Sequence, residues 1–149
     1  GSSGGAAVAL AHRMLPLADG SDFMGSLRNP AGWNNVFGYR PSFGRVPSVP
    51  SSDVFGQTFA VSGPMARRVR DVAFLLSIQA GPDSRSPFSL TDDPARFAGS
   101  LDREWKGHRI GWLGDLQGAL ATEPGVLDTC EKALSAFRSI GMAVDLRMA

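Results

Sequence analysis

The chain has 149 residues, a formal net charge of +1, 43% hydrophobic residues and 19% charged residues. This composition is typical of a soluble globular domain with a sizeable core, and it excludes a strongly basic nucleic-acid binder or a membrane-surface binder. The longest apolar stretches are too short to form a membrane-spanning helix. The only cysteine is Cys130, which excludes an internal disulfide framework and a multi-cysteine metal site and indicates a reducing, cytoplasmic compartment.

Short elements and glycine-rich turns alternate in the first third of the chain. The alanine-rich residues 6–14 have good helix propensity, and their small side chains permit close packing, so we expect a buried helix. The expected elements of this part are a serine turn at 1–5, the helix at 6–14, a strand at 15–18, a second serine turn at 19–26, and a short helix at 27–33. Ser26 then lies near the N-terminal end of the second helix.

The middle of the chain is predicted to contain two strands and one amphipathic helix. A proline- and serine-rich loop at 41–53 separates the strands at 36–39 and 59–61. Apolar residues then recur at helical spacing between a start signal at Ser62-Gly63-Pro64 and a stop signal at Gly81-Pro82. The members of this apolar stripe are Met65, Val69, Val72, Ala73 and Leu76.

The C-terminal third is predicted to form a β-α-β unit after a long loop. The expected elements are a loop at 82–104 with one helical turn near 97–101, a strand at 109–113, a helix at 123–139 and a strand at 142–146. Thr122 is expected to cap the helix and Gly141 to end it. Taken with the earlier elements, this pattern predicts an α/β fold in which helices cover a sheet.

Several large or sulfur-bearing side chains are predicted to serve packing. Cys130 shares one helix face with apolar residues, namely Val126, Leu134 and Phe137, and we therefore expect it in the core. We also expect the three tryptophans to be packing residues: Trp33, Trp105 and Trp112.

Three sequence blocks carry the strongest functional signal. They are Gly1-Ser2-Ser3-Gly4-Gly5, the run from Asp19 to Pro30 (DGSDFMGSLRNP), and the run from Gly38 to Pro47 (GYRPSFGRVP). Together they resemble the amidase signature family closely, and the resemblance extends over nearly all of the chain. It implies an amidase signature fold, a mixed β-sheet covered by helices, of which residues 1–149 would form one part.

The first block has two other interpretations. A Gly-Ser-Ser-Gly leader can remain from an expression vector, and a glycine-rich loop before a helix can bind phosphate. The block continues as Gly5-Ala6-Ala7-Val8 and meets the second motif at the family's spacing, which favours a native turn. It also lacks the Gly-Lys-Ser/Thr ending that a P-loop needs, which disfavours the phosphate site.

In the amidase signature family, serines of the first two blocks belong to a Ser-cisSer-Lys triad. By position, the resemblance assigns Ser26 as the nucleophile and Ser2 as the proton relay. It assigns the oxyanion hole to the backbone N–H groups of four consecutive residues: Phe23, Met24, Gly25 and Ser26. Donors aimed in this way stabilise an acyl-transfer transition state by roughly 3 to 4 kcal/mol each.

Neighbouring residues are expected to support this turn and to influence which substrate it accepts. Asp22 and Arg28 bracket the candidate nucleophile and are expected to hold the loop by charge-assisted hydrogen bonds, with a plain surface pair as the alternative. Ser3 is expected to support the first turn. Most family members have a second glycine where this chain has Met24, which changes the shape of the acyl pocket. The Asn34-Asn35 pair departs from the cysteine-bearing version typical of glutamyl-tRNA(Gln) amidotransferase A subunits, which disfavours that function.

A serine nucleophile needs a base. The family's catalytic lysine lies upstream of the first block, so we expect it outside these 149 residues and expect no activity from this chain alone. The two lysines present, Lys106 and Lys132, are expected to be solvated surface charges. His12 and His108 lie in no recognisable Ser-His-Asp context and are expected to be structural.

The sequence therefore predicts an amidase that hydrolyses a small-molecule carboxamide through a seryl acyl-enzyme, with no metal or organic cofactor. We expect no nucleic-acid partner and no membrane partner, and a homodimer stays open as the assembly. Two alternatives are kept. One is an amidotransferase A-like subunit, which would need a protein partner and tRNA, and the other is an inert fragment that lacks the lysine.

Overall fold

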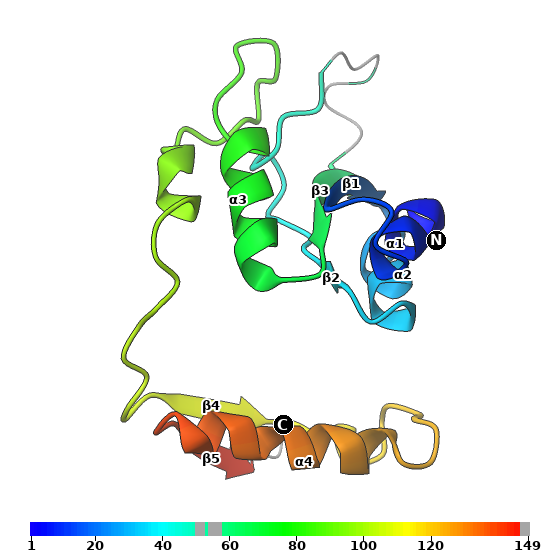
Figure 1. Ribbon diagram of the computed structural model, residues 1–149, viewed down its shortest axis with the longest axis vertical. Coiled ribbons are helices and arrows are strands. Elements are labelled where there is room, and N and C mark those ends of the chain that lie inside the picture. Colours follow the sequence, from blue (N-terminus) through cyan, green and yellow to red (C-terminus); the bar gives the residue numbers. More distant parts are fainter. Residues whose placement is uncertain (50–52, 54–57, 147–149) are drawn as a thin grey trace. The chain divides into compact units, whose positions relative to one another are not determined.

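The computed structural model describes residues 1–49, 53 and 58–146, which form two compact units (Figure 1). The first unit is Gly1–Leu101 and the second is Asp102–Ala149. Both serine turns belong to the first unit, whereas Lys106 and Lys132 belong to the second. No helix of the described residues has the length and apolar character needed to cross a bilayer.

The first unit is built on a three-stranded antiparallel sheet with helices on both faces (Figure 1). The strand order is β1-β3-β2, so β3 is central. Helices α1 and α2 lie on one side of this sheet and α3 on the other. Its elements are α1 (Gly4–Ala11), β1 (Leu17–Asp22), α2 (Arg28–Trp33), β2 (Phe37–Gly38), β3 (Val61–Ala66), α3 (Val69–Gln79) and the 3-10 helix η1 (Pro94–Phe97).

The core of the first unit lies mainly between α1, α2 and the sheet. Its fully or almost fully buried members are Ala7, Leu10, Leu27, Ala31 and Met65. On the opposite face, α3 buries Val72 and Leu76. The expected helix at 6–14 ends at Ala11, because Arg13 takes a left-handed backbone conformation with φ of 60°.

Strand β1 runs further than the sequence indicates, and residues 19–22 are strand rather than turn. Its residues pair one by one with β3, from Leu17 opposite Ala66 to Asp22 opposite Val61. Gly20 permits this close approach, because a methyl group there would lie 2.6 Å from the hydroxyl oxygen of Ser3. The strand therefore delivers Asp22 directly to the start of the second serine turn.

The central strand β3 contains residues that the sequence pattern places in a helix start. Ser62-Gly63-Pro64 lies within the strand, and Met65 is buried in β3 rather than on the stripe of α3. Pro64 is tolerated because β2 ends at Gly38, one residue before Tyr39, so no ladder hydrogen bond is needed from the Pro64 nitrogen. The Pro64 carbonyl still accepts from the N–H of Tyr39 at 3.0 Å. The helical turn expected near 97–101 lies instead at η1, where the side chain of Asp93 accepts from the N–H of Ala95.

The second unit is the predicted β-α-β arrangement. Strands β4 (Arg109–Trp112) and β5 (Ala143–Leu146) pair in parallel and are joined by α4 (Val126–Ser139). The helix begins three residues later than predicted, and its N-cap is Gly125 rather than Thr122. Gly125 has a φ of 85°, a conformation that suits glycine and ends the preceding turn.

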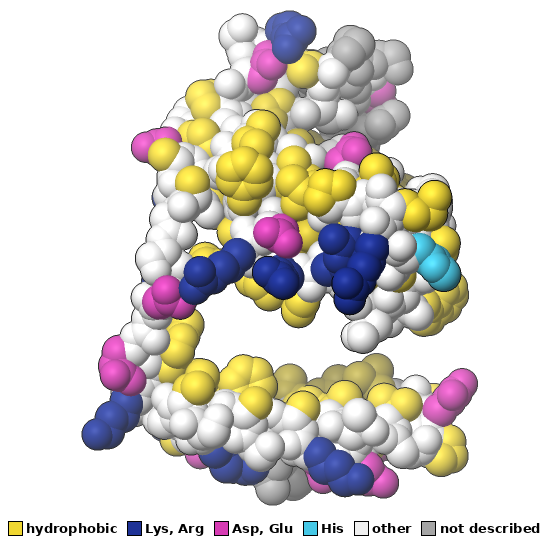
Figure 2. Space-filling view, in the orientation of Figure 1, with side chains coloured by type: hydrophobic (Ala, Val, Ile, Leu, Met, Phe, Trp, Pro, Cys, Tyr) yellow, Lys and Arg dark blue, Asp and Glu magenta, His cyan; other side chains and the backbone are white. Residues whose placement is uncertain are grey.

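Two packing predictions are wrong. Cys130 is exposed, and the only buried residue of α4 is Leu134. Trp33, at the C-terminal end of α2, is 82% exposed. Figure 2 shows hydrophobic side chains on the surface of the second unit. Val126 in α4 and Ile140 directly after it are both exposed. The helical periodicity of α4 thus identifies its apolar face correctly but does not show that this face is covered.

Candidate active site

The two serine turns lie against each other. The backbone N–H of Ser3 donates to the carbonyl of Ser26 over 3.1 Å. A methyl group on Gly1 would lie 2.6 Å from the Cα of Ser26, so the backbones of the two turns are in contact. Ser2 is exposed and Ser26 is half-buried. The structure therefore brings together the two segments that carry the predicted nucleophile and relay.

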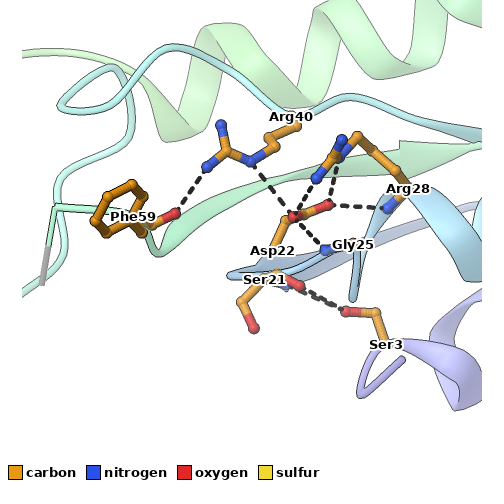
Figure 3. Close-up of polar contacts among 7 residues, drawn as sticks. All are labelled: Ser3, Ser21, Asp22, Gly25, Arg28, Arg40 and Phe59. Carbon is orange, nitrogen blue, oxygen red and sulfur yellow. Dashed lines mark hydrogen bonds and ion pairs between the residues drawn. The ribbon is translucent and has the colours of Figure 1, made fainter.

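Ser3 links the start of α1 to the end of β1. It is 7% exposed, and its hydroxyl oxygen accepts from the N–H of Ser21 over 3.2 Å (Figure 3). The same hydroxyl lies 3.4 Å from the carbonyl oxygen of Ser21, to which it donates. Ser21 takes part through its backbone alone, and the residue is exposed.

A buried carboxylate organises the second turn. Asp22 is fully buried and accepts from the N–H of Gly25 at 2.8 Å and from the N–H of Arg28 at 3.2 Å. The Arg28 side chain adds Nε at 2.9 Å and Nη2 at 3.0 Å, one to each carboxylate oxygen (Figure 3). These hydrogen bonds from Arg28, followed by the backbone donors, hold the pKa of Asp22 well below its usual range although burial opposes them. The ionised carboxylate fixes both ends of the turn.

Arg40 extends this network to a distant part of the chain. Its Nε lies 3.3 Å from Oδ1 of Asp22, and its Nη2 donates to the carbonyl of Phe59 over 2.7 Å (Figure 3). The ring of Phe59 meets that of Phe23 edge to face, with centroids 6.4 Å apart. Neither Arg40 nor Phe59 is among the site residues predicted from the sequence. Arg40 lies inside the third motif block, so the sequence could have identified it as a candidate site residue. No sequence feature connects Phe59 with the turn.

One of the four N–H groups predicted for the oxyanion hole has a partner within the protein. Gly25 turns its N–H to Asp22, so this donor is not directed at a substrate. Within residues 1–49, 53 and 58–146, the N–H groups of the other three members of the set make no hydrogen bond to the protein: Phe23, Met24 and Ser26. Gly25 has a φ of 97°, which a side chain would oppose, and it reverses the chain between these donors. The turn can therefore offer three N–H groups to an oxyanion.

The lysines and histidines lie at the surface. Lys106 precedes β4 and Lys132 lies in α4, and both are exposed, which confirms their prediction as solvated charges. His12 follows α1 directly and His108 contacts Trp105 edge to face, and both histidines are exposed. The described residues of the first unit contain no lysine.

Comparison with known proteins gives a consistent result. A family model described as Amidase matches residues 1–146. The chain is 43% identical over 145 residues to the glutamyl-tRNA(Gln) amidotransferase A subunit of Thermus thermophilus, covering 97% of this chain and 30% of that protein. It is 38% identical over 144 residues to an acylamidase of Rhodococcus erythropolis, again covering 97% of this chain and 30% of the relative.

Solved structures agree with these relatives. A bacterial aryl acylamidase belonging to the amidase signature enzymes superposes with a TM-score of 0.87 at 36% identity, covering 99% of this chain and 30% of that one. The glutamyl-tRNA(Gln) amidotransferase A subunit of Thermotoga maritima superposes with a TM-score of 0.84 at 30% identity, covering 99% and 32%. The chain thus spans about a third of the length of the proteins it matches.

Proposed function

This chain belongs to the Amidase family, and from that premise we propose that it forms the serine-bearing part of a hydrolase that cleaves carboxamide C–N bonds through a seryl acyl-enzyme. The observation that carries the proposal is the contact between the two serine turns. The Ser3 N–H donates to the Ser26 carbonyl, and Gly1 lies against the Ser26 backbone. Residues 1–149 would then correspond to part of an amidase signature domain.

The proposed reaction uses Ser26 and Ser2 in sequence. The Ser26 oxygen attacks the carbonyl carbon of the amide, and its proton passes to Ser2 and on to a base. We propose a lysine N-terminal to the first turn as that base, as the resemblance to the amidase signature family implies. The C–N bond then breaks as the leaving nitrogen takes up a proton, and water hydrolyses the ester to release the acid and free Ser26.

Three backbone donors support charge development in this reaction. The N–H groups of Phe23, Met24 and Ser26 surround the bend that Gly25 creates and are free to hold the oxyanion. Each well-aimed donor of this kind lowers the barrier by roughly 3 kcal/mol. Asp22 and Arg28 do not touch the substrate in this scheme. They act as positioning residues that keep the donors in place.

We propose a small-molecule amide as the substrate, in the cytoplasm, and a homodimer as an assembly compatible with that role. The 43% identity to an amidotransferase A subunit favours a second function, in which the amide is glutamine and the ammonia passes to another subunit. This alternative predicts amide hydrolysis that depends on partner subunits, ATP and tRNA. The first function predicts hydrolysis without them.

Labelling of the nucleophile tests both functions. We expect a fluorophosphonate to modify the full-length protein at Ser26, mapped by peptide mass spectrometry. A Ser26→Ala variant should lose the label, while Ser21→Ala, an exposed serine of the same segment, should keep it. Ammonia release from simple amides, with and without ATP and tRNA, then separates the two functions. A label on Ser2, or full labelling of Ser26→Ala, would contradict the assignment, and unlabelled protein without ammonia release would indicate an inert chain.

A further inference from the structure

We propose that Phe23, Met24 and Phe59 form an apolar subsite that accepts an aromatic or long aliphatic group next to the scissile carbonyl. This inference rests on the proposed function and names the substrate class of that site. Phe23 and Met24 belong to the turn that ends in Ser26, and Phe59 reaches the same place from the segment before β3.

The three side chains are unusually exposed for their apolar character. Phe23 is 59% exposed, Met24 is 82% exposed and Phe59 is 68% exposed. The two rings meet edge to face at 6.4 Å with an interplanar angle of 89°, an arrangement that stabilises aromatic pairs. Such a pair is a ready contact for a third ring or an aliphatic chain, whereas a flexible methionine can adapt to its shape.

The pair is held in place by the same carboxylate that holds the serine turn. Arg40 donates to the carbonyl of Phe59 and also pairs with Asp22, so one side-chain bridge fixes Phe59 relative to the nucleophile (Figure 3). The bridge uses the backbone of Phe59 and leaves its ring free to contact a ligand. Phe59 can therefore be truncated to alanine without removing the Arg40 contact.

The chemistry of these side chains selects against a short polar substrate. Phe23 and Phe59 carry no hydrogen-bonding group and the Met24 sulfur is only a weak acceptor, so a polar substrate group gains little from contact with these side chains. A glutamine side chain with its charged amino-acid end would gain no charge-assisted hydrogen bond from these three side chains. A phenyl or long alkyl group would instead remove apolar surface from water.

The experiment compares three amides on the full-length protein: acetamide, phenylacetamide and acetanilide. Phenylacetamide adds a ring on the acyl side and acetanilide adds a ring on the amine side. We measure kcat/KM for wild type, for Phe59→Ala, and for Trp33→Ala as a control, because Trp33 is also a largely exposed aromatic and lies at the C-terminal end of α2. Each variant is referred to wild type on the same substrate, so differences in intrinsic reactivity cancel.

Phe59→Ala should lower the preference for a ring-bearing amide over acetamide by about threefold to tenfold, the value of one aromatic contact. Trp33→Ala should leave the preference within about twofold, as expected for a surface change remote from the site. If Phe59→Ala lowers the preference for phenylacetamide, the subsite accepts the acyl side of the amide. If it lowers the preference for acetanilide, the subsite accepts the amine side. An unchanged preference in both arms overturns the subsite.

A binding measurement separates this inference from the proposed reaction. In a Ser26→Ala background, calorimetry should show phenylacetamide binding weakened by about threefold to tenfold when Phe59→Ala is added. An unchanged Kd would overturn the subsite even in an active enzyme, and a weakened Kd would support it even if no amide is turned over. If Phe59→Ala does not fold, Phe59→Leu keeps an apolar side chain without the ring. This variant should lose its preference for aromatic amides while it still binds long aliphatic amides.

Discussion

The two serine turns of the first unit are held in different ways. The second turn is fixed by the fully buried Asp22, which binds two backbone N–H groups and the Arg28 side chain. The first turn has no ionic contact among the described residues, and its anchors are the Ser3 hydroxyl and one hydrogen bond to the Ser26 carbonyl. The position of Ser2 therefore depends on the second turn, while the second turn is rigid through its own side chains. In the proposed mechanism, the more firmly held turn is thus the one that carries the nucleophile and the oxyanion donors.

The largest expected effect separates the chemical roles of the two turns. Ser2→Ala should lower kcat of the full-length enzyme by about a hundredfold to ten-thousandfold, because it removes proton transfer and leaves the nucleophile in place. The expected signature is slow turnover with Ser26 still labelled, measured by steady-state kinetics and by peptide mass spectrometry after fluorophosphonate treatment. Ser21→Ala is the control and should keep normal turnover. Wild-type kcat in Ser2→Ala would remove Ser2 from the reaction.

The next effect tests whether the buried carboxylate holds the second turn. Asp22→Asn should destabilise the full-length protein by about 2–3 kcal/mol, since it leaves buried donors and two arginines without their anion. Asp19→Asn, an exposed aspartate of the same strand, should change the unfolding free energy by less than about 0.5 kcal/mol. The measurement is denaturant unfolding at neutral pH. Equal stability of the two variants would show that Asp22 does not organise the turn.

The pH dependence of this difference follows from the lowered pKa of Asp22. A carboxylate with a depressed folded pKa contributes its full stability above the ordinary value of about 3.9, and the contribution fades as pH falls towards the lowered value. The gap between wild type and Asp22→Asn should therefore be constant from pH 7 to about 5 and shrink below about 4. A gap that widens on acidification would contradict this sign.

A smaller effect concerns the bend between the oxyanion donors. Gly25→Ala should cost about 1–2 kcal/mol, because the φ of 97° is unfavourable for alanine and its methyl would lie 2.6 Å from the Asn29 side chain. Gly32→Ala is the matched control, since Gly32 lies in α2 with open space around it and should gain stability from alanine's helix propensity. Thermal unfolding of both variants gives the comparison. A Gly25→Ala protein as stable as Gly32→Ala would show that the bend is not constrained.

The smallest expected effect is in the first turn. Ser3→Ala should cost about 1 kcal/mol, the net value of the hydrogen bond from the Ser21 N–H. The rate of Ser26 labelling should change less than in Gly25→Ala, because the donors of the second turn keep their own network. A labelling defect larger than that of Gly25→Ala would reverse the proposed order of dependence between the turns.

The site was predictable where its residues are close in sequence. The spacing of Asp22 and Arg28 around Ser26 predicts a pair, and the structure contains it. The hydrogen bond from the Gly25 N–H to Asp22 was not foreseen, because motif reasoning does not consider that a nearby carboxylate competes for the same N–H. The Arg40 bridge to Phe59 joins residues 19 positions apart through a backbone carbonyl, and no side-chain pattern encodes that partner.

The type of most elements was predictable from the periodicity of apolar residues, but their boundaries were not predictable from glycine and proline signals. The β-α-β unit follows from alternating apolar segments, and the structure confirms it. Pro64 is typical of a helix start, yet it lies in β3. The strand tolerates it because β2 is only two residues long and ends at Gly38, so no ladder N–H is needed from Pro64. Cys130 lies on the apolar face of α4, of which the described residues bury only Leu134.

The parallel pair of β4 and β5 has a consequence for handling this protein. Within the described residues these strands pair only with each other, so each presents an outer edge of unpaired backbone groups. The adjoining helix also exposes Val126 and Ile140. Open edges beside apolar surface are the usual starting points for aggregation. For a preparation of residues 1–149 alone, solubility at high concentration is therefore expected to depend on the second unit, far from the serines in sequence. Charged substitutions at these strand edges should improve it.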